Sequence, residues 1–270
     1  MVVFPPAGLS CPAPPHPCRE TTSLKSVGRI AELWRYPVSS LGGEKVDHLD
    51  IAQAGAAESG IAGNRAFLLF DPETRAPASP ESAERWRKAL HLVARLRADG
   101  MAEIGFPDGT WLPVDAPDVE ERLSTHFGFP VGLGETRGTG QSWPVIAPRY
   151  AASPLHLLTT ASMNAIGASD PALMLDSRRF RPDILVETEA APGFVENDWI
   201  GRRIVIGSLE ITATEGTKRC GMTMISQPGV PEQPDVLRSI LRGNRRNLGI
   251  YADIAAPGRI SLGDEVWIET

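Results

Sequence analysis

The fold is indicated first by ten residues in the second half of the chain, Ile204-Val205-Ile206-Gly207-Ser208-Leu209-Glu210-Ile211-Thr212-Ala213. Branched and apolar residues stand on both sides of Gly207-Ser208, a dipeptide that suits a tight turn. The pattern predicts two antiparallel strands. Residues 258–268 show the same organisation about Gly263-Asp264, and predict a terminal hairpin.

Other apolar stretches predict further strands and helices. The strands are expected at residues 27–38, 46–51, 65–70 and 184–186. The helices are expected at residues 80–99, 119–127, 159–166 and 236–243. Short strands with a few helices predict an α+β, mostly β fold, closed or sandwiched, with helices at its rim.

The clearest helix is predicted at residues 80–99. Ser79 suits its N-cap, Pro80 its first turn and Gly100 its end. Five apolar residues share one helical face, namely Trp86, Ala89, Leu90, Val93 and Leu96. We therefore expect a helix that packs this face against the core.

The chain is expected to divide at a glycine-rich stretch, residues 128–140. Its sequence, GFPVGLGETRGTG, has no helical period and predicts a linker or loop. The proline-rich head carries Cys11 and Cys18 and no periodic apolar pattern, which predicts a disordered tail. The predicted division is a tail at residues 1–26, one domain at 27–140 and a second at 141–270.

Composition excludes several classes of protein. With 270 residues, 42% hydrophobic and 22% charged, the chain is typical of soluble globular proteins. Its net charge of -6 argues against broad binding to nucleic acid or anionic membranes, and no apolar run approaches the roughly 20 residues of a membrane span. The 3 cysteines do not make a disulfide framework and the head lacks a secretory signal, so a cytoplasmic location is expected.

Cys220 is the single cysteine outside the head, and it directly follows Lys218 and Arg219. Nearby cations stabilise a thiolate, the form that attacks electrophiles and binds soft metals. A lone cysteine is more often a small buried hydrophobe, so its surroundings must decide between the two interpretations.

Arginines are concentrated in the same half of the chain. Arg178, Arg179 and Arg181 stand in SRRFRPDI. Because guanidinium groups hold phosphate through paired hydrogen bonds, this cluster predicts a small anionic ligand. Arg202 and Arg203 are instead expected on a solvated face.

The sequence lacks the motifs of several common enzyme classes. It contains no G-x-S-x-G elbow, no H-E-x-x-H and no phosphate-binding P-loop. Asp183 and Asp198 are candidate catalytic acids, but the sequence does not show whether either forms a pair with another carboxylate. The scattered histidines are more typical of satisfied or exposed side chains than of ligands; they are His16, His48, His91, His126 and His156.

Five motifs resemble those of a known family. They occur in the order and spacing of the MOSC domain, which is named after molybdenum cofactor sulfurases. The five motifs are RRFRPDILV, FVENDWIG, TKRCGMTMIS, LGIYADI and GRISLGDEV. Upstream, GRIAELWRYPVSSLGGEKV and GNRAFLLFD resemble the N-terminal β-barrel domain that precedes MOSC in the amidoxime-reducing proteins and their bacterial relatives. The resemblance covers the chain from about Val27 onward. It implies a β-barrel-like MOSC domain packed with an N-terminal β-barrel domain.

The resemblance also implies the site residues. Cys220 matches the cysteine that ligates molybdenum in that family. The pterin and its phosphate are held in the family by residues that match Ser40, Arg65, Ser153, Arg181, Asp183, Arg219 and Tyr251. This set agrees with a thiolate for a metal and arginines for a phosphate.

Four positions depart from the family pattern. Ser39 replaces a lysine, Ala152 replaces a threonine, and Lys218 stands where a small hydroxyl residue is common. Asp183 replaces an asparagine, and an ionised carboxylate cannot donate a hydrogen bond as an amide does. Lys218 is a candidate cofactor contact that replaces the missing charge.

The function implied by the resemblance is that of a molybdenum cofactor oxidoreductase. It would reduce N-hydroxylated or other N-oxygenated small molecules by oxygen transfer to molybdenum. The sequence contains no cysteine-rich ferredoxin segment, so a separate donor of the ferredoxin, flavodoxin or cytochrome type is expected. Two alternatives are a non-catalytic carrier of the cofactor or of sulfur on Cys220, and a β-rich interaction protein that has lost the ligand. Retention of Cys220, Arg181 and Tyr251 weighs against the last alternative.

Overall fold

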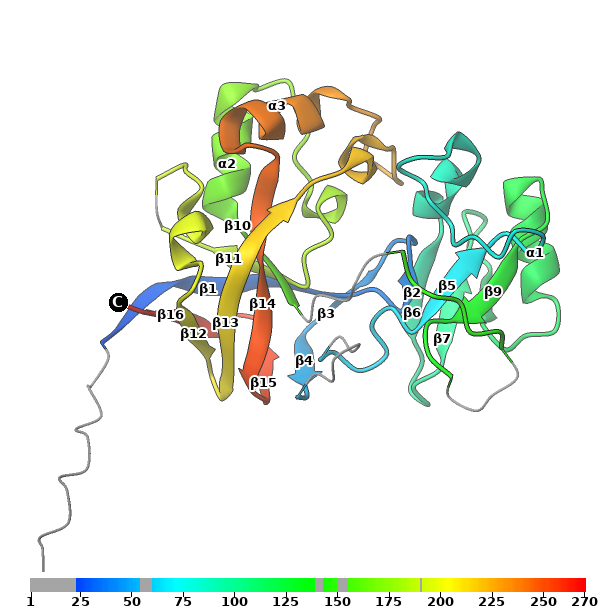
Figure 1. The fold of residues 1–270 in the computed structure, drawn as a ribbon, viewed down its shortest axis with the longest axis horizontal. Helices are drawn as coiled ribbons and strands as arrows, with labels where there is room; N and C mark the ends of the chain where they lie inside the picture. Colours follow the sequence, from blue (N-terminus) through cyan, green and yellow to red (C-terminus); the bar gives the residue numbers. More distant parts are fainter. Residues whose placement is uncertain (1–22, 54–59, 139–142, 150–154, 190) are drawn as a thin grey trace, which may run out of the picture.

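The computed structural model describes residues 23–53, 60–138, 143–149, 155–189 and 191–270. Figure 1 shows two lobes side by side: a barrel that carries helices α2 and α3, and a smaller lobe that carries α1. The predicted α+β, mostly β fold is confirmed. Within the described ranges, no helix has the length and apolar character needed to cross a membrane.

The first lobe is a barrel of seven strands, closed because β1 pairs with both β16 and β11. In order around the ring the strands are β11 (Ile184–Glu187), β10 (Leu155–Thr159), β14 (Asn247–Ala256), β13 (Leu209–Lys218), β12 (Arg203–Ile206), β16 (Glu265–Glu269) and β1 (Leu24–Arg35). Strand β3 (Glu44–Val46) extends the sheet beyond β1. Closure pairs the strands that would otherwise be open edges.

Apolar side chains fill the barrel because successive strand residues point to opposite faces. In the predicted hairpin Ile204, Ile206, Leu209 and Ile211 are buried in this core, and Glu210 between them is partly exposed. Strand β12 pairs with β13, with Ile206 opposite Leu209. The hairpin predicted around Gly207-Ser208 is therefore confirmed.

Two α-helices cover one outer side of the barrel. Helix α2 (Thr160–Ser169), predicted at residues 159–166, directly follows β10, and the Thr159 hydroxyl caps it by accepting a hydrogen bond from the Ser162 amide (3.1 Å). Helix α3 (Asp235–Asn244) packs against α2, and an apolar cluster lies beneath them. The helix predicted at residues 236–243 is confirmed, with one further residue at each end.

The second lobe contains two small sheets around its own core. One sheet is β2 (Val38–Ser39), β5 (Phe67–Phe70) and β9 (Gly132–Glu135), and the other is β6 (Val93–Leu96), β7 (Ala102–Gly105) and β8 (Trp111–Pro113). Helix α1 (Val119–Phe127), present as predicted, buries Val119, Leu123 and Phe127 in this core. Where the resemblance implies an N-terminal β-barrel, the described residues of this lobe form two separate three-stranded sheets.

Residues 80–99 do not form the predicted helix. The 3-10 helix η1 covers Glu84–His91 only, and β6 follows it. The predicted buried face is right for Trp86, Ala89 and Leu90. Beyond them, antiparallel pairing of β6 with β7 overrides the local helical preference.

The glycine-rich stretch at residues 128–140 is not simply a loop. Strand β9 runs through it and pairs with β5. A Cβ added at Gly132 would lie 2.5 Å from Cζ of Phe70, so glycine permits this close packing. The glycines that led to the prediction of a loop are thus required for the close packing of this buried strand.

The predicted terminal hairpin is wrong in its pairing. Both strands are present, with Gly263 left-handed between them (φ 84°). However, β15 (Gly258–Ser261) pairs with β4 (His48–Ile51), and β16 pairs with β1 and β12. Closing the barrel recruits β16 to distant strands, which the local turn pattern cannot indicate.

The N-terminal strands connect the two lobes. The strand predicted at residues 27–38 is divided at Pro37 into β1, in the barrel, and β2, in the second lobe. The strands predicted at residues 65–70 and 184–186 are confirmed as β5 and β11. Strands β1 and β3 precede residue 140 yet lie in the barrel sheet, and the predicted domain division at that residue stays a prediction.

Candidate functional site

Cys220 lies where β13 leaves the barrel, directly before the 3-10 helix η4 (Gly221–Met224). Exposure alternates at the end of β13 and just after it, with Thr217 and Arg219 buried and Lys218 exposed. Cys220 itself is half-buried. The strand thus places a partly accessible thiol beside a buried guanidinium.

The turn after Cys220 is fixed by hydrogen bonds to its backbone. The Cys220 carbonyl accepts from the Thr223 amide (3.2 Å) and hydroxyl (3.0 Å). Arg179 in turn donates from Nη1 to the Thr223 carbonyl (3.2 Å). Its other donors reach the Met174 and Pro231 carbonyls (3.0 and 2.6 Å). Arg179, fully buried at 0% exposure, therefore stabilises the turn after Cys220 from the protein interior.

The three arginines of SRRFRPDI have different roles. The prediction that they form one anion-binding cluster is therefore wrong. Arg178 forms a two-pronged ion pair with Asp176 (2.8 and 2.7 Å), and Arg179 binds carbonyls. Arg181 alone faces the predicted cofactor residues. The expectation for Arg202 and Arg203 is confirmed, because Arg202 is exposed and Arg203 pairs with Glu210 (2.7 Å) at the surface.

Arg181 is held over an aromatic ring by a strained backbone. Its guanidinium carbon lies 4.3 Å from the centre of the Tyr36 ring, and its Nη1 donates to the Leu41 carbonyl. Burial lowers the pKa of Arg181 to about 10, and nearby Arg65 also lowers it. Three predicted cofactor residues have left-handed backbones: Ser40 (φ 70°), Arg65 (φ 53°) and Arg181 (φ 51°). Such strained non-glycine residues are concentrated at functional sites.

Asp183 is buried and accepts two hydrogen bonds. Its donors are the His156 amide (2.8 Å) and Nδ2 of Asn64 (3.2 Å). Burial raises the pKa of the Asp183 carboxyl, and the nearby Arg65 opposes this effect. Because both partners are donors, a carboxylate satisfies this position, whereas an asparagine would have a single acceptor oxygen. The departure from the family asparagine is therefore matched by its surroundings.

Arg219 is buried with an unused donor. Its Nη2 donates to the Phe180 carbonyl (2.5 Å) and its Nη1 lies 3.4 Å from Nε2 of His156. Its Nε is buried and has no hydrogen-bond partner among the described residues. Burial lowers the pKa of this guanidinium. An unpaired buried N–H is costly, so this atom is available to a ligand acceptor.

His156 is neutral in this environment. Its Nδ1 lies 3.1 Å from the Arg181 carbonyl, which can only accept, and its Nε2 faces the Arg219 guanidinium, which can only donate. The tautomer protonated on Nδ1 satisfies both contacts. Burial, aided by Arg219, lowers the pKa of His156 to about 3.

His156 is expected to make the fold sensitive to acid. The unfolded chain takes up a proton near pH 6.5 and the folded chain near pH 3, so the stabilisation is complete above pH 6.5 and is lost as the pH falls toward 3. Between these values, the wild type should lose about 1.4 kcal/mol more free energy of unfolding per pH unit than His156→Gln. Urea denaturation of both proteins at several pH values measures this difference. Equal slopes would contradict the assignment.

The site carries an excess of positive charge. Arg65, Arg181 and Arg219 act on one another electrostatically, and the buried Asp183 carboxyl acts on Arg65 and Arg181. These four side chains comprise three guanidinium groups and one carboxyl. An anionic ligand would offset the excess, so these residues fit the phosphate of a pterin cofactor.

The remaining predicted residues occupy different positions. The Tyr251 ring meets the His156 ring edge to face at 5.7 Å, which places Tyr251 in the site. Ser40 directly precedes Leu41, whose carbonyl binds Arg181. Lys218 lies on the exposed side of β13, opposite to Arg219, and Ser153 falls outside the described residues. Their contacts with a cofactor stay predictions.

Several site residues were not predicted from the sequence. Three of them are Tyr36, Asn64 and His156, which contact the predicted cofactor residues. The sequence marks them only by their position next to recognised motifs, as Asn64 precedes Arg65. Glu81, from the second lobe, packs on the residue after Cys220: its carbonyl oxygen lies 3.1 Å from where a Cβ of Gly221 would be. Glu81 forms an ion pair with Arg149. Only the tertiary fold brings it against the residue that follows Cys220.

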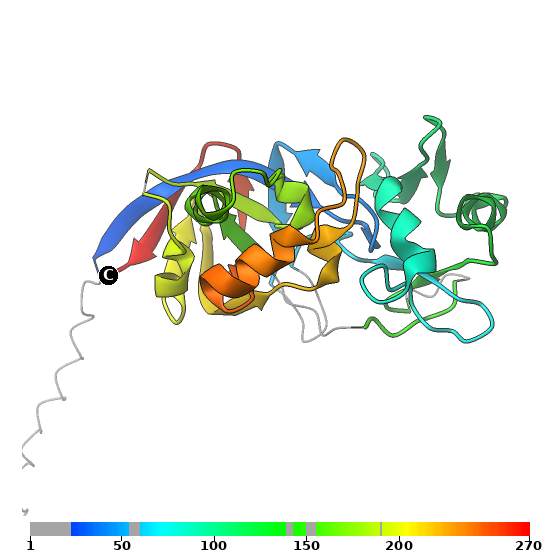
Figure 2. The ribbon, with the colours of Figure 1, turned by 90° about the horizontal axis from the view of Figure 1, so that it is seen from above.

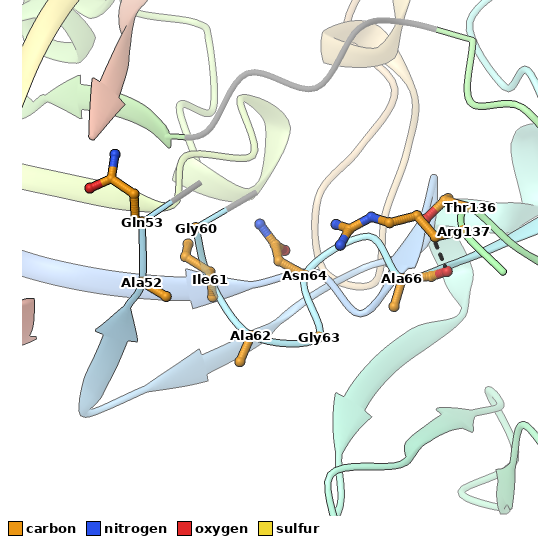
Figure 3. Close-up of a pocket in the computed structure, with 10 residues that line it drawn as sticks. All are labelled: Ala52, Gln53, Gly60, Ile61, Ala62, Gly63, Asn64, Ala66, Thr136 and Arg137. Carbon is orange, nitrogen blue, oxygen red and sulfur yellow. Dashed lines mark hydrogen bonds between the residues drawn. The ribbon is translucent and has the colours of Figure 1, made fainter. Parts of the chain in front are cut away.

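A cavity of about 220 Å³ borders the site on the side of Asn64. Its wall includes Gln53, Ile61, Thr136 and Arg137, and in Figure 3 the guanidinium of Arg137 extends toward Asn64. Asn64 both lines this cavity and donates to Asp183. The cavity therefore adjoins the charged group of residues.

Comparison with known proteins gives matches over most of the chain. A family model described as the MOSC domain matches residues 125–267. Mitochondrial amidoxime-reducing component 1 of Homo sapiens is 23% identical over 304 residues, covering 93% of this chain and 86% of that protein. Its counterpart in Mus musculus is 20% identical over 298 residues, covering 93% and 85%. The solved YuaD protein from Bacillus subtilis is similar in fold, with a TM-score of 0.50 at 13% identity over 93% of this chain and 99% of that one.

Proposed function

Because this chain belongs to the MOSC domain family, matched over residues 125–267, we propose that it binds a molybdenum cofactor and reduces N-oxygenated compounds. The proposal accords with the names of the relatives, which are amidoxime-reducing components. The substrate class would be N-hydroxylated bases and amidoximes.

One observation carries the proposal. The His156 ring lies between the Arg181 carbonyl and the Arg219 guanidinium, its amide donates to the buried Asp183, and Arg219 is the immediate neighbour of the half-buried Cys220. A soft thiolate ligand and an excess of guanidinium groups are what a metal and an anionic pterin require. The unpartnered Nε of Arg219 adds a donor for that anion.

The residues present fit the cofactor. Cys220 would ligate molybdenum, while Arg181 and Arg219 would bind the phosphate and Tyr251 would lie beside the pterin. When bound, the cofactor supplies oxygen-atom transfer chemistry. The protein's own part is to hold the thiolate, orient the anion through rigid arginines and keep Asp183 buried as an acceptor.

The proposed net reaction consumes two electrons. A hydroxylamine R–NHOH takes up two electrons and two protons and gives R–NH₂ and water, so the N–O bond breaks and nitrogen is reduced. The electrons would come from a separate electron-transfer protein, which is oxidised, and the protons from solvent.

The wild-type protein, expressed in a host that makes the cofactor, tests the proposal. We expect molybdenum near one atom per chain by elemental analysis, and reduction of benzamidoxime with reduced methyl viologen as donor. Protein without molybdenum would overturn the proposal. Protein that binds the cofactor but shows no turnover would favour the carrier role, which needs the same thiol and arginines.

A further inference from the structure

We propose that the exposed face of α3 and the turn after it form the docking surface for an acidic electron-transfer protein. This inference rests on the proposed function, whose reaction needs an external donor. We define the α3 basic surface by Arg238, Leu241, Arg242, Arg245 and Arg246. All five residues are exposed.

Helix α3 has two contrasting faces. Val236 and Ile240, four residues apart, are buried toward the barrel. Arg238, Arg242 and Arg245 follow a spacing of four and three residues, so they share the opposite face with Leu241. Figure 2 shows α3 lying along the outside of the barrel lobe. The basic residues are thus presented to solvent together.

Most of this charge is not neutralised locally. Arg238 pairs with Asp235 (2.6 Å), one helical turn away. Among the described residues, no carboxylate lies within ion-pair distance of Arg242, Arg245 or Arg246. The whole chain carries a net charge of -6, so this patch is a local exception. Such a patch attracts and orients an acidic partner.

The surface is joined directly to the segment that holds Cys220. The Arg219 amide donates to the Arg246 carbonyl (2.8 Å), and Nε of Arg246 donates back to the Arg219 carbonyl (2.6 Å). Helix α3 also packs against η4, the turn that follows Cys220. A donor bound here would therefore contact the structure next to the metal ligand.

The backbone of the turn gives an independent indication that its charges are needed. Arg245 (φ 49°) and Arg246 (φ 76°) are consecutive left-handed residues. Glycine or asparagine would occupy these positions with less strain. The chain instead keeps two arginines there, and Arg246 alone has a described structural contact through its side chain.

The chemistry of the surface indicates the class of partner. Leu241, 56% exposed, provides an apolar contact beside the arginines. An exposed apolar side chain beside cations suits a protein with acidic residues around its redox centre. Two molecules of a one-electron donor would supply the electrons for each N–O bond broken.

The test uses the full-length holoprotein with reduced plant-type [2Fe–2S] ferredoxin as an acidic probe donor. For Arg242→Glu, we expect the KM for ferredoxin to rise about tenfold or more at low salt, and turnover with methyl viologen to stay unchanged. Arg245→Gly should also raise the KM although it relieves the strained turn, so its Tm should not fall. Lys25→Glu, which also reverses a single charge, is the matched control at an exposed position of β1.

Binding without turnover separates this inference from the proposed function. Calorimetric titration with oxidised ferredoxin should show weaker binding for Arg242→Glu whether or not the wild type is active. Equal ferredoxin KM and binding in the wild type, Arg242→Glu and the control would overturn the inference. It would also be overturned if the α3 variants lost binding only to vesicles with about one-third phosphatidylserine, which would identify a membrane surface instead.

Discussion

Cys220→Ala is expected to lose molybdenum by about tenfold or more relative to the wild type, because the metal would lose its protein ligand. The fold should be retained. The hydrogen bonds that fix the turn are made by the Cys220 carbonyl, which alanine keeps. Elemental analysis of freshly purified protein, with Tm measured on the same samples, checks both parts of the expectation.

The matched control for this variant is Cys11→Ser combined with Cys18→Ser. These thiols lie in the head, far in sequence from every predicted site residue. The double variant should keep its molybdenum and its reductase activity. If Cys220→Ala kept a full complement of molybdenum, the assignment of Cys220 as the metal ligand would be wrong.

Arg179→Met is expected to lower the free energy of unfolding by about 3 kcal/mol or more. Methionine has a similar length but cannot donate, so the Met174, Thr223 and Pro231 carbonyls would lose their buried partner. Each unsatisfied carbonyl costs about 1 kcal/mol or more. Urea denaturation at neutral pH measures the loss.

The adjacent arginine provides the control for this prediction. Arg178 pairs with Asp176 near the surface, so Arg178→Met should cost at most about 1 kcal/mol. Arg179→Lys, which keeps a charge and three donors, should recover part of the stability. Equal losses in Arg178→Met and Arg179→Met would show that the buried contacts of Arg179 do not support the turn.

The candidate site was only partly predictable. Cys220, Arg181, Arg219 and Tyr251 are found together in the structure, and short sequence motifs marked each of them. Glu81 was missed because it lies in the other lobe and reaches Gly221 only through tertiary packing. No local pattern reports a contact between residues so far apart in the chain.

The sequence by itself determined many of the local elements and the family. The residues around Gly207-Ser208 form the predicted hairpin because alternation and a tight turn are local properties. The tertiary structure alone decided which strands pair and which acceptors each buried arginine binds. Strands β15 and β16 share a turn yet pair elsewhere, because closing the barrel recruits β16 to β1. Arg178, Arg179 and Arg181 look alike in sequence, but burial gives each a different set of acceptors. Pairing and burial depend on residues distant along the chain, and hence only the folded protein assigns them.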